Sequence, residues 1–264
     1  MIKLSIIITH HNTPELLDLC IKSIRNTVQD LNYEIIITDS EATERNQEFI
    51  KEKYPDIDYI TFKKNVGYAK MVNAGIKAIN GEYVLILNAD IIVLEGAISE
   101  MVKFLDNNKK AGIVAPQLLD FTNNIQISCF ANPTWKAIVA RRTLWGKTKR
   151  GRDILGKFII SNWDRNSTRE VDWVQGSAIM FRREAIDKVG LWDERFFMYF
   201  EDTDWCRRFW QNGFKVVYLP SAKMVHYYHR SSKKLGILDA LLNKYTRTHI
   251  ISAIKYFIKY KKSK

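Results

Sequence analysis

The chain has 264 residues, of which 46% are hydrophobic and 12% aromatic, and its formal net charge is +12. This composition excludes a disordered chain and is typical of a globular protein that buries a sizeable core, even as a single domain. No apolar run approaches the roughly 20 residues that span a bilayer, and the first run, residues 4–8, is too short for a secretory signal.

The N-terminal half alternates between strand and helix patterns. Apolar, β-branched runs predict strands at residues 4–9, 33–38, 58–62 and 82–87. We expect helices at 14–28, 43–53 and 67–79, the first with Thr13 as N-cap and Pro14 as its first residue. Apolar strands separated by helices indicate an α/β protein with a largely parallel sheet covered on both faces.

The C-terminal half is less regular at first. Residues 117–172 show few clear periods, and we expect them to form an inserted, partly flexible segment. Order returns at Val171. The expected elements are a strand within 171–183, a short helix ending at Gly190, a helix over 201–213 with Gly213 just past its end, and a strand at 214–220.

Polar or small residues follow each expected strand of the N-terminal half. They occupy positions 9–12, 39–40, 63–67 and 88–90. Ligands of parallel sheets bind beyond the carboxyl ends of the strands, so these residues should meet at one rim. Loops are polar in any protein, but that alone accounts less well for Asp39 and Asp90, which both end strands of the buried type.

Common nucleotide-binding motifs are missing from the sequence. The dinucleotide fingerprint G-x-G-x-x-G, the P-loop and the G-x-S-x-G elbow are all absent. The stretch EYVLILNAD, residues 82–90, instead resembles a site for a metal ion and a diphosphate. Mg²⁺ and Mn²⁺ take oxygen ligands from one or two carboxylates and from substrate phosphates, and the ion neutralises a leaving diphosphate.

Seven sequence blocks occur in a characteristic order. They are SIIITHHN (5–12), ITDSEAT (37–43), NVGYAKMVNAGI (65–76), LILNAD (85–90), WVQGSAIMFRR (173–183), FFMYFEDTDWCRR (196–208) and the histidine of MVHYYHRSS (224–232). Together they resemble the inverting family 2 glycosyltransferases of the GT-A fold, particularly the bacterial rhamnosyltransferase-like group. The resemblance covers roughly residues 3–230.

The resemblance implies a fold and a division of the chain. The fold would be GT-A, with a Rossmann-like, largely parallel mixed sheet and helices on both faces. One domain would span residues 1–232, with a nucleotide-sugar-binding half (1–116) and an acceptor and catalytic half (117–232). Residues 233–264 would form a basic, amphipathic C-terminal extension.

The resemblance also implies a donor site and a metal site. The residues that would bind the nucleotide-sugar are Thr9, His11, Asp39, Gly67, Asn73, Asn88 and Asp90. Asn88-Ala89-Asp90 stands where the family has D-x-D, so Asp90 would be the one strong carboxylate ligand of Mg²⁺ or Mn²⁺, and His226 would complete the metal shell. His10, His11 and His229 are otherwise typical of surface or internally bonded histidines.

The stretch FFMYFEDTDWCRR places three carboxylates among aromatic residues. An inverting transfer needs one general base, and the resemblance assigns this role to Asp202, at a helix N-terminus that favours a carboxylate. Glu201, Trp173 and Gly176 would contact the acceptor, although Trp173 and Gly176 also fit ordinary core and turn positions. Asp204 would be structural and pair with Arg207 or Arg208. The alternative is that all three carboxylates merely cap a helix.

The positive charge is concentrated in two segments, residues 136–169 and 233–264, each with a net charge of +8. In the second, residues 250, 251, 254, 257 and 258 fall on one helical face, with Lys255, Lys259 and Lys262 beside it. Such a helix can bind an anionic membrane surface, or it can pack on the protein body.

We therefore expect a cytoplasmic enzyme, peripheral on the inner face of the cell membrane. It would transfer L-rhamnose from dTDP-rhamnose, or another sugar from a UDP-sugar, to a hydroxyl of a cell-surface glycan or lipid-linked acceptor. A nucleic-acid-binding protein is an alternative suggested by the charge, but no binding module is recognisable. The three cysteines have no C-x-x-C spacing and indicate buried thiols in a reducing cytoplasm.

Overall fold

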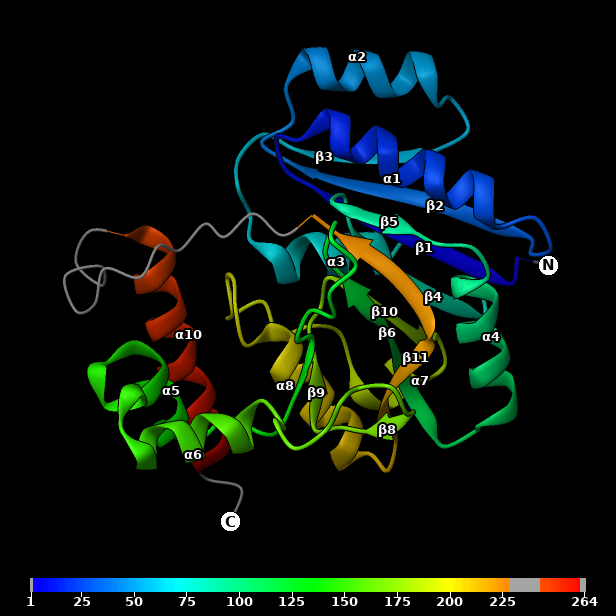
Figure 1. Cartoon of the computed structure of the whole chain (residues 1–264). Coiled ribbons are helices and arrows are strands. Elements are labelled where there is room, and N and C mark those ends of the chain that lie inside the picture. Colours follow the sequence, from blue (N-terminus) through cyan, green and yellow to red (C-terminus); the bar gives the residue numbers. More distant parts are fainter. Residues whose placement is uncertain (1, 228–242, 262–264) are drawn as a thin grey trace.

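The computed structural model describes residues 2–227 and 243–261, and within them nine strands form one mixed sheet (Figure 1). The sheet strands are β1 (Leu4–His10), β2 (Tyr33–Ser40), β3 (Asp58–Phe62), β4 (Tyr83–Asn88), β5 (Ile91–Val93), β6 (Ala111–Leu119), β8 (Arg169–Glu170), β10 (Ala178–Arg182) and β11 (Lys215–His226). They run in the order β3-β2-β1-β4-β10-β6-β11-β5, with β8 paired to β11. A second, two-stranded sheet pairs β7 (Cys129–Phe130) with β9 (Trp173–Val174).

Helices cover both faces of the large sheet, as expected. The described helices are α1 (Pro14–Thr27), α2 (Glu44–Lys53), α3 (Tyr68–Ile76), α4 (Ala97–Asn107), α5 (Trp135–Arg142), the 3₁₀ helix η1 (Leu144–Lys147), α6 (Lys149–Phe158), α7 (Ala185–Val189), α8 (Glu201–Gln211) and α10 (Lys244–Lys261). Helices α1, α2 and α4 contribute to a hydrophobic cluster on one face, and α3, α7 and α8 to a cluster on the other. The three cysteines are buried and free of disulfides.

The strand register brings three polar tips side by side. Strand β1 pairs in parallel with β2 and β4, and Thr9 lies opposite Thr38 on one side and Asn88 on the other. All seven residues of β1 are buried, because the strand is central and helices cover both its faces. The predicted rim therefore exists at the carboxyl ends of these strands.

Residues 117–172, expected to form an inserted, partly flexible segment, contain more regular structure than the sequence indicated. Residues 117–119 complete β6, whose nine residues are all buried, and the segment continues through α5 and α6. The side chains of Thr134 and Thr148 accept hydrogen bonds from the backbone at the starts of these helices. The strand pattern of β6 was hard to recognise in the sequence because Pro116 and Gln117 interrupt its apolar run. The helical pattern of α5 and α6 was hard to recognise because both helices are rich in Lys and Arg. The elements β5 and α4 and the first part of β6, all between residues 91 and 116, were not predicted.

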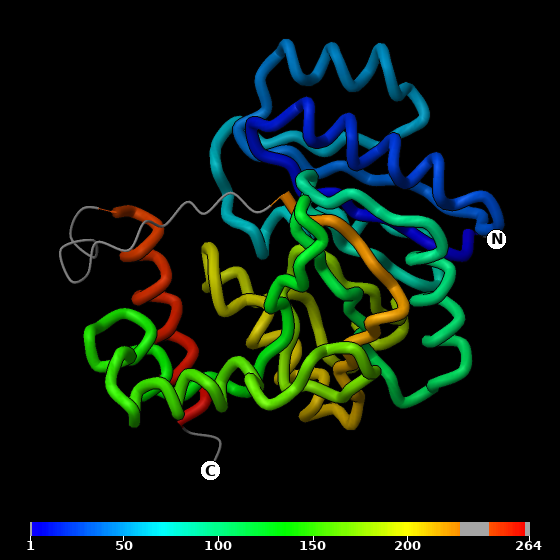
Figure 2. The backbone as a smooth tube through the Cα atoms, viewed as in Figure 1, coloured from blue at the N-terminus to red at the C-terminus, as the bar shows by residue number. Residues whose placement is uncertain are grey.

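Helix α10 packs against the body, mainly through residues outside the apolar face named from the sequence. Ala253 and Tyr256 are buried in a cluster with Ile138, Phe196 and Phe200, whereas Ile251, Ile254 and Ile258 are exposed. Figure 2 shows α10 running alongside the segment that contains α5 and α6. The proposed boundary at residue 232, His229 and Lys262 lie outside the described residues. Within the described part of the chain, no helix is long and apolar enough to cross a membrane.

Candidate active site

Asp90 and His226 lie together at the ends of β4 and β11. His226 Nε2 is 3.6 Å from Asp90 Oδ1, and that buried oxygen has no hydrogen-bond donor. Burial raises the pKa of Asp90 to about 6 and lowers the pKa of His226 to about 4. At neutral pH the imidazole is therefore neutral, which is the state that binds metals.

A residue that the sequence analysis missed, Gln126, orients His226. Its Oε1 lies 3.0 Å from His226 Nδ1, and its Nε2 donates to the backbone carbonyl of His226 at 2.9 Å. Because an amide oxygen can only accept a hydrogen bond, the proton of the neutral imidazole is on Nδ1. The other ring nitrogen, Nε2, carries the lone pair and faces Asp90. Metal-binding histidines are typically held in this way by a second partner.

The residues of this corner fit a divalent ion. They supply one buried carboxylate oxygen and one correctly oriented imidazole nitrogen, which suit Mn²⁺ or Mg²⁺. No group of three or more His, Cys, Asp or Glu side chains able to hold a metal occurs among residues 2–227 and 243–261. Diphosphate oxygens and water would have to fill the remaining positions, as is usual for Mg²⁺.

Tyr68, at the start of α3, connects the tip of β4 with the catalytic segment. Its hydroxyl lies 3.0 Å from Asn88 Oδ1 and 2.7 Å from the carbonyl oxygen of Gly176. Thr9 Oγ1 donates to the same Asn88 oxygen at 3.1 Å. Burial raises the pKa of Tyr68, and the charges of Glu201, Asp202 and Asp90 raise it further. Tyr68 therefore links Asn88 of the predicted donor site to Gly176, whose backbone N–H donates to Asp202.

Asp202 is held at the N-terminus of α8 by three hydrogen bonds. Its Oδ2 accepts from the Gly176 backbone N–H at 3.1 Å, and its Oδ1 accepts from the N–H and hydroxyl of Thr203 at 2.7 and 3.2 Å. Burial raises the pKa of Asp202, while these hydrogen bonds oppose the shift. A raised pKa improves a carboxylate as a base near neutral pH.

Glu201 differs from its neighbour. It is buried, and its Oε2 has no hydrogen-bond partner. Burial, and then the charge of Asp202, hold the pKa of Glu201 well above its ordinary value. Glu201 therefore keeps its proton to a higher pH than an ordinary glutamate, and a protonated carboxyl can donate a hydrogen bond to a hydroxyl.

The backbone before these two carboxylates is strained. Tyr199 and Phe200 have φ values of 69° and 68°, in the left-handed region that costs non-glycine residues about 1–3 kcal/mol each. Helix α10 supports them: Ser252 donates to the carbonyl of Met198 at 2.8 Å, and Tyr256 packs on Phe200 with ring centroids 5.3 Å apart. The C-terminal helix thus helps to hold the segment that presents Asp202.

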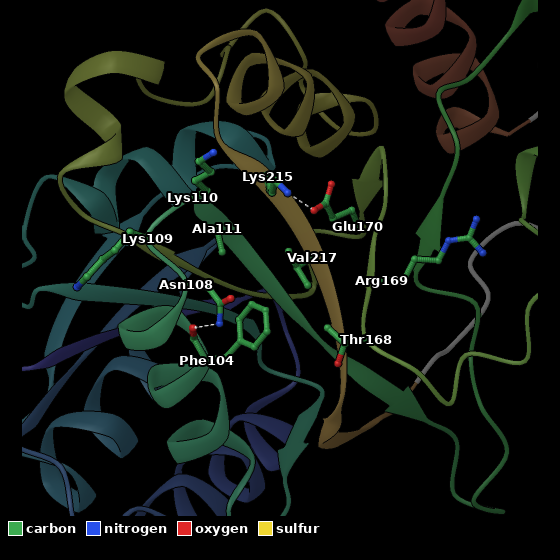
Figure 3. A pocket seen from close by; sticks show the side chains of 10 residues that line it. All are labelled: Phe104, Asn108, Lys109, Lys110, Ala111, Thr168, Arg169, Glu170, Lys215 and Val217. Atoms are coloured by element: carbon green, nitrogen blue, oxygen red, sulfur yellow. Dashed lines mark hydrogen bonds and ion pairs between the residues drawn. The ribbon is translucent and has the colours of Figure 1, made fainter.

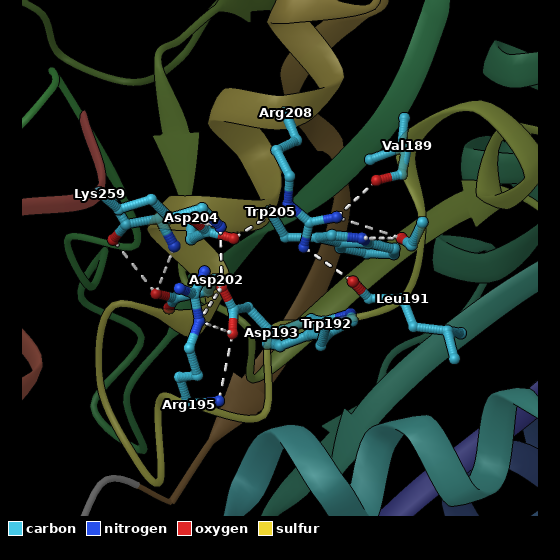
Figure 4. Close-up of polar contacts among 12 residues, drawn as sticks. Val189, Leu191, Trp192, Asp193, Arg195, Asp202, Asp204, Trp205, Arg208 and Lys259 are labelled. Carbon is cyan, nitrogen blue, oxygen red and sulfur yellow. Dashed lines mark hydrogen bonds and ion pairs between the residues drawn. The ribbon is translucent and has the colours of Figure 1, made fainter. Parts of the chain in front are cut away.

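The predicted pairing of Asp204 with Arg208 is confirmed (Figure 4), and Asp204 is fully buried. Arg208 contacts it at 2.9 Å, one helical turn along α8, and Lys259 of α10 contacts it at 2.5 Å. Lys259 also contacts Asp193 at 2.8 Å. Asp204 therefore joins α8, α10 and the segment at 191–200 into one network.

Asp39 and the adjacent histidines lie at the tips of β1 and β2. Asp39 is fully buried between His10 Nδ1, 2.9 Å from its Oδ1, and the hydroxyl of Tyr59, which donates to its Oδ2. His10 also accepts from the Thr13 N–H, so it is an internally bonded histidine. His11 is more exposed and lies 3.0 Å from the carbonyl of Ser40. Of this group, His11 has the side chain most accessible to a ligand.

Three other predicted residues contact the protein itself. Gly67 has φ +85°, and a Cβ there would lie 2.5 Å from the Phe197 carbonyl oxygen. Asn73 Nδ2 donates to the Trp192 carbonyl, and Asn73 Oδ1 accepts from the Trp192 N–H, both at 2.9 Å. The Trp173 indole donates to the carbonyl of Ala131 at 3.0 Å and its ring stacks on Phe130. These contacts give each residue a positioning role.

A separate hollow of about 490 Å³ lies at the opposite end of β6 and β11 (Figure 3). Lys109, Lys110, Arg169 and Lys215 are among its lining residues, and none of the predicted site residues lines it. Asp90 and His226 meet at the far end of β11, so this hollow does not belong to the candidate active site.

Known proteins similar to this chain include rhamnosyltransferases. An N-acetylglucosaminyl-diphospho-decaprenol L-rhamnosyltransferase of Mycobacterium tuberculosis is 26% identical over 73% of this chain and 66% of its own length, so the chain spans just under two thirds of that relative. Rhamnosyltransferase WbbL of Escherichia coli K12 is 23% identical, and the match covers 95% of this chain and 91% of WbbL.

The fold and the family follow from two further comparisons. The crystal structure of GalNAc-T7 with UDP, GalNAc and Mn²⁺ matches 88% of this chain and 45% of that chain, with a TM-score of 0.65 and 16% sequence identity, which supports a GT-A-like fold. The profile of "Glycosyl transferase family 2" matches residues 5–190, which is more than half of the chain. The chain therefore belongs to glycosyl transferase family 2.

Proposed function

We propose that the enzyme transfers a sugar from a nucleotide-diphosphate donor to an acceptor hydroxyl with inversion, and that Asp202 is the general base. The observation that carries this proposal is the geometry of Asp202, which is anchored by Gly176 and Thr203 with a raised pKa. In a single displacement, the acceptor oxygen forms the new bond to the anomeric carbon, the nucleoside diphosphate leaves, and Asp202 takes the hydroxyl proton.

Asp90 and His226 would hold a Mg²⁺ or Mn²⁺ ion, since they supply the oxygen and nitrogen described above. When bound, the ion would neutralise charge on the leaving diphosphate. Thr9, His11, Asp39 and Asn88 would line the nucleotide side of the site. Asp39 would act through its partners Tyr59 and His10, which enclose it. Gly67 and Asn73 would shape the site by fixing the segment that leads to α8.

Glu201 would contact the acceptor. Its unpartnered Oε2 and raised pKa fit a protonated carboxyl that donates to one acceptor hydroxyl while Asp202 accepts from another. Gly176 would act by holding Asp202. Trp173, in β9, would act by supporting the turn that follows at 176–177. The charge of Asp202 raises the pKa of Glu201, so the titration of these two carboxyl groups belongs to the pair.

We propose L-rhamnose from dTDP-rhamnose as the donor, and a UDP-sugar as the alternative. Both relatives described above are named as rhamnosyltransferases. The mycobacterial relative is named for a lipid-diphosphate acceptor. A lipid-linked glycan is therefore the proposed acceptor. The enzyme would act as a cytoplasmic, peripheral protein on the inner face of the membrane, with the transferase domain over 1–232 and the extension over 233–264.

A panel of nucleotide-sugars tests this proposal. Donor binding stabilises the native state, by about 2.7 kcal/mol at a concentration of 100 Kd. For a chain of this size that corresponds to a rise in Tm of roughly 5–10 °C. We expect dTDP-rhamnose with Mn²⁺ to produce this shift, and transfer to a lipid-diphosphate acceptor to follow. A larger rise in Tm with a UDP-sugar would identify that UDP-sugar as the donor in place of dTDP-rhamnose. No rise with any nucleotide-sugar would contradict the proposed function.

A further inference from the structure

Helix α10 carries an exposed apolar ridge. Ile251, Ile254 and Ile258 are 52, 43 and 62% exposed. Their spacing of three and four places them on one side of the helix, opposite the side that packs on the 191–200 segment. Single exposed apolar residues need no explanation, but a row of three large ones on an ordered helix indicates a contact surface.

A second segment extends this ridge. Trp135 and Val139 of α5 and Leu144 of η1 are also exposed, Leu144 at 76%. Trp135 stacks on Phe257 of α10 with ring centroids 4.1 Å apart. The exposed apolar residues of α5 therefore adjoin those of α10, although about 115 positions separate them in the sequence. Figure 1 shows the two helices side by side at the edge of the molecule.

The charge of this region has one sign. Helix α5 contains three Lys or Arg residues, η1 contains one and α10 contains five, and these three elements contain no Asp or Glu. Lys244, Lys255 and Lys261 are exposed beside the isoleucines, and Lys136 and Arg141 are exposed on α5. The described parts of the two basic segments of the sequence thus adjoin each other.

We propose that the exposed sides of α5, η1 and α10 form one docking surface for an anionic lipid bilayer. Apolar side chains would enter the interface while the surrounding cations contact lipid headgroups. Nucleic acid would use the cations but offers little to a ridge of aliphatic side chains, so a bilayer fits both features better. The purpose of binding a bilayer rests on the proposed function, because a lipid-linked acceptor would lie in the same membrane. Helix α10 joins this surface directly to the Met198 backbone.

Vesicle sedimentation without donor or acceptor tests the surface independently of transfer. The full chain is mixed with vesicles of phosphatidylglycerol and phosphatidylcholine, and with phosphatidylcholine alone. The variants are the double substitution I254S/I258S, the triple substitution K136Q/K244Q/K261Q, and L19S as a matched control. Leu19 is 48% exposed on α1, which packs on the other face of the sheet from α8. Thermal unfolding and nucleotide binding verify that each variant is folded.

We expect the wild type to bind anionic vesicles, with weaker binding to neutral ones and at high salt. Each isoleucine removed should weaken partition roughly five- to tenfold, and each charge removed about fivefold, whereas L19S should bind normally. Two results would overturn the proposal. One is normal vesicle binding by I254S/I258S. The other is a wild type that does not bind vesicles but forms a dimer, while I254S/I258S is monomeric. In that case the surface would bind a second copy of the chain.

Discussion

Replacing Asp202 with asparagine removes the proposed base while preserving the size of the side chain. General base catalysis contributes typically about 10²- to 10⁴-fold, so kcat should fall by that factor. Donor affinity should change little, because the described hydrogen bonds of Asp202 are to Gly176 and Thr203. Transfer is followed by product formation, and donor binding by calorimetry.

The structure also predicts a cost in stability. The two oxygens of Asp202 accept from different backbone N–H groups, of Gly176 and Thr203. Asparagine has only one carbonyl oxygen, so in either orientation its amide nitrogen faces one of these donors. An unsatisfied buried donor costs about 1–3 kcal/mol, or a Tm decrease of roughly 2–12 °C here. The rates must therefore be compared at a temperature where both proteins are folded.

The pH dependence separates a lost base from a distorted site. Burial raises the pKa of Asp202, so kcat/KM should rise with pH along an acid limb above the ordinary aspartate value of about 3.9. Asp202→Asn should abolish that limb. The matched variant Glu201→Gln should keep it and raise the acceptor KM more than it lowers kcat. Near-normal kcat in Asp202→Asn, or loss of the limb in Glu201→Gln alone, would refute the assignment.

Three further results follow from the site. Excess chelator should abolish transfer, measured by product formation with and without added Mn²⁺, and full activity in chelator would exclude a metal role for Asp90 and His226. Gln126→Ala should weaken Mn²⁺ binding, measured by calorimetry with nucleotide present, by about 10- to 100-fold, because His226 loses the partner that orients it; an unchanged affinity would contradict that role. Asp204→Asn should lower stability by about 3–5 kcal/mol in thermal or denaturant unfolding, because it leaves Arg208 and Lys259 without their buried carboxylate; a folded but inactive variant would instead make Asp204 catalytic.

Features encoded locally were accessible from the sequence. The four N-terminal strands and their polar tips follow from short apolar runs and their ends. The pairing of Asp204 with Arg208 follows from helical spacing, and the end of α8 follows from Gly213, whose φ is +79°. Each of these depends on fewer than a dozen neighbouring residues, so propensity and periodicity suffice to predict them.

Features that depend on distant contacts were not accessible. Gln126 is 100 positions from His226, and Tyr68 is 108 positions from Gly176, so no local pattern links them. The face through which α10 packs on the body was not predicted, for the same reason. Isoleucine is the more hydrophobic residue, but aromatic partners at Phe196 and Phe200 select Tyr256 for the interior and leave the isoleucines outside.

Helix α10 packs on the protein through one face and exposes isoleucines on the other, so a deletion of the helix perturbs both faces. On the sequence alone, deleting residues 250–264 should weaken vesicle binding and leave nucleotide binding intact. In the structure that deletion also removes Ser252 and Lys259, which hold Met198, Asp193 and Asp204. The strained backbone at Tyr199 and Phe200 would lose part of its support, so a deletion would perturb the catalytic segment together with the exposed ridge. Substitutions confined to Ile254 and Ile258 leave the inner contacts in place, and they are therefore the change that separates membrane binding from catalysis.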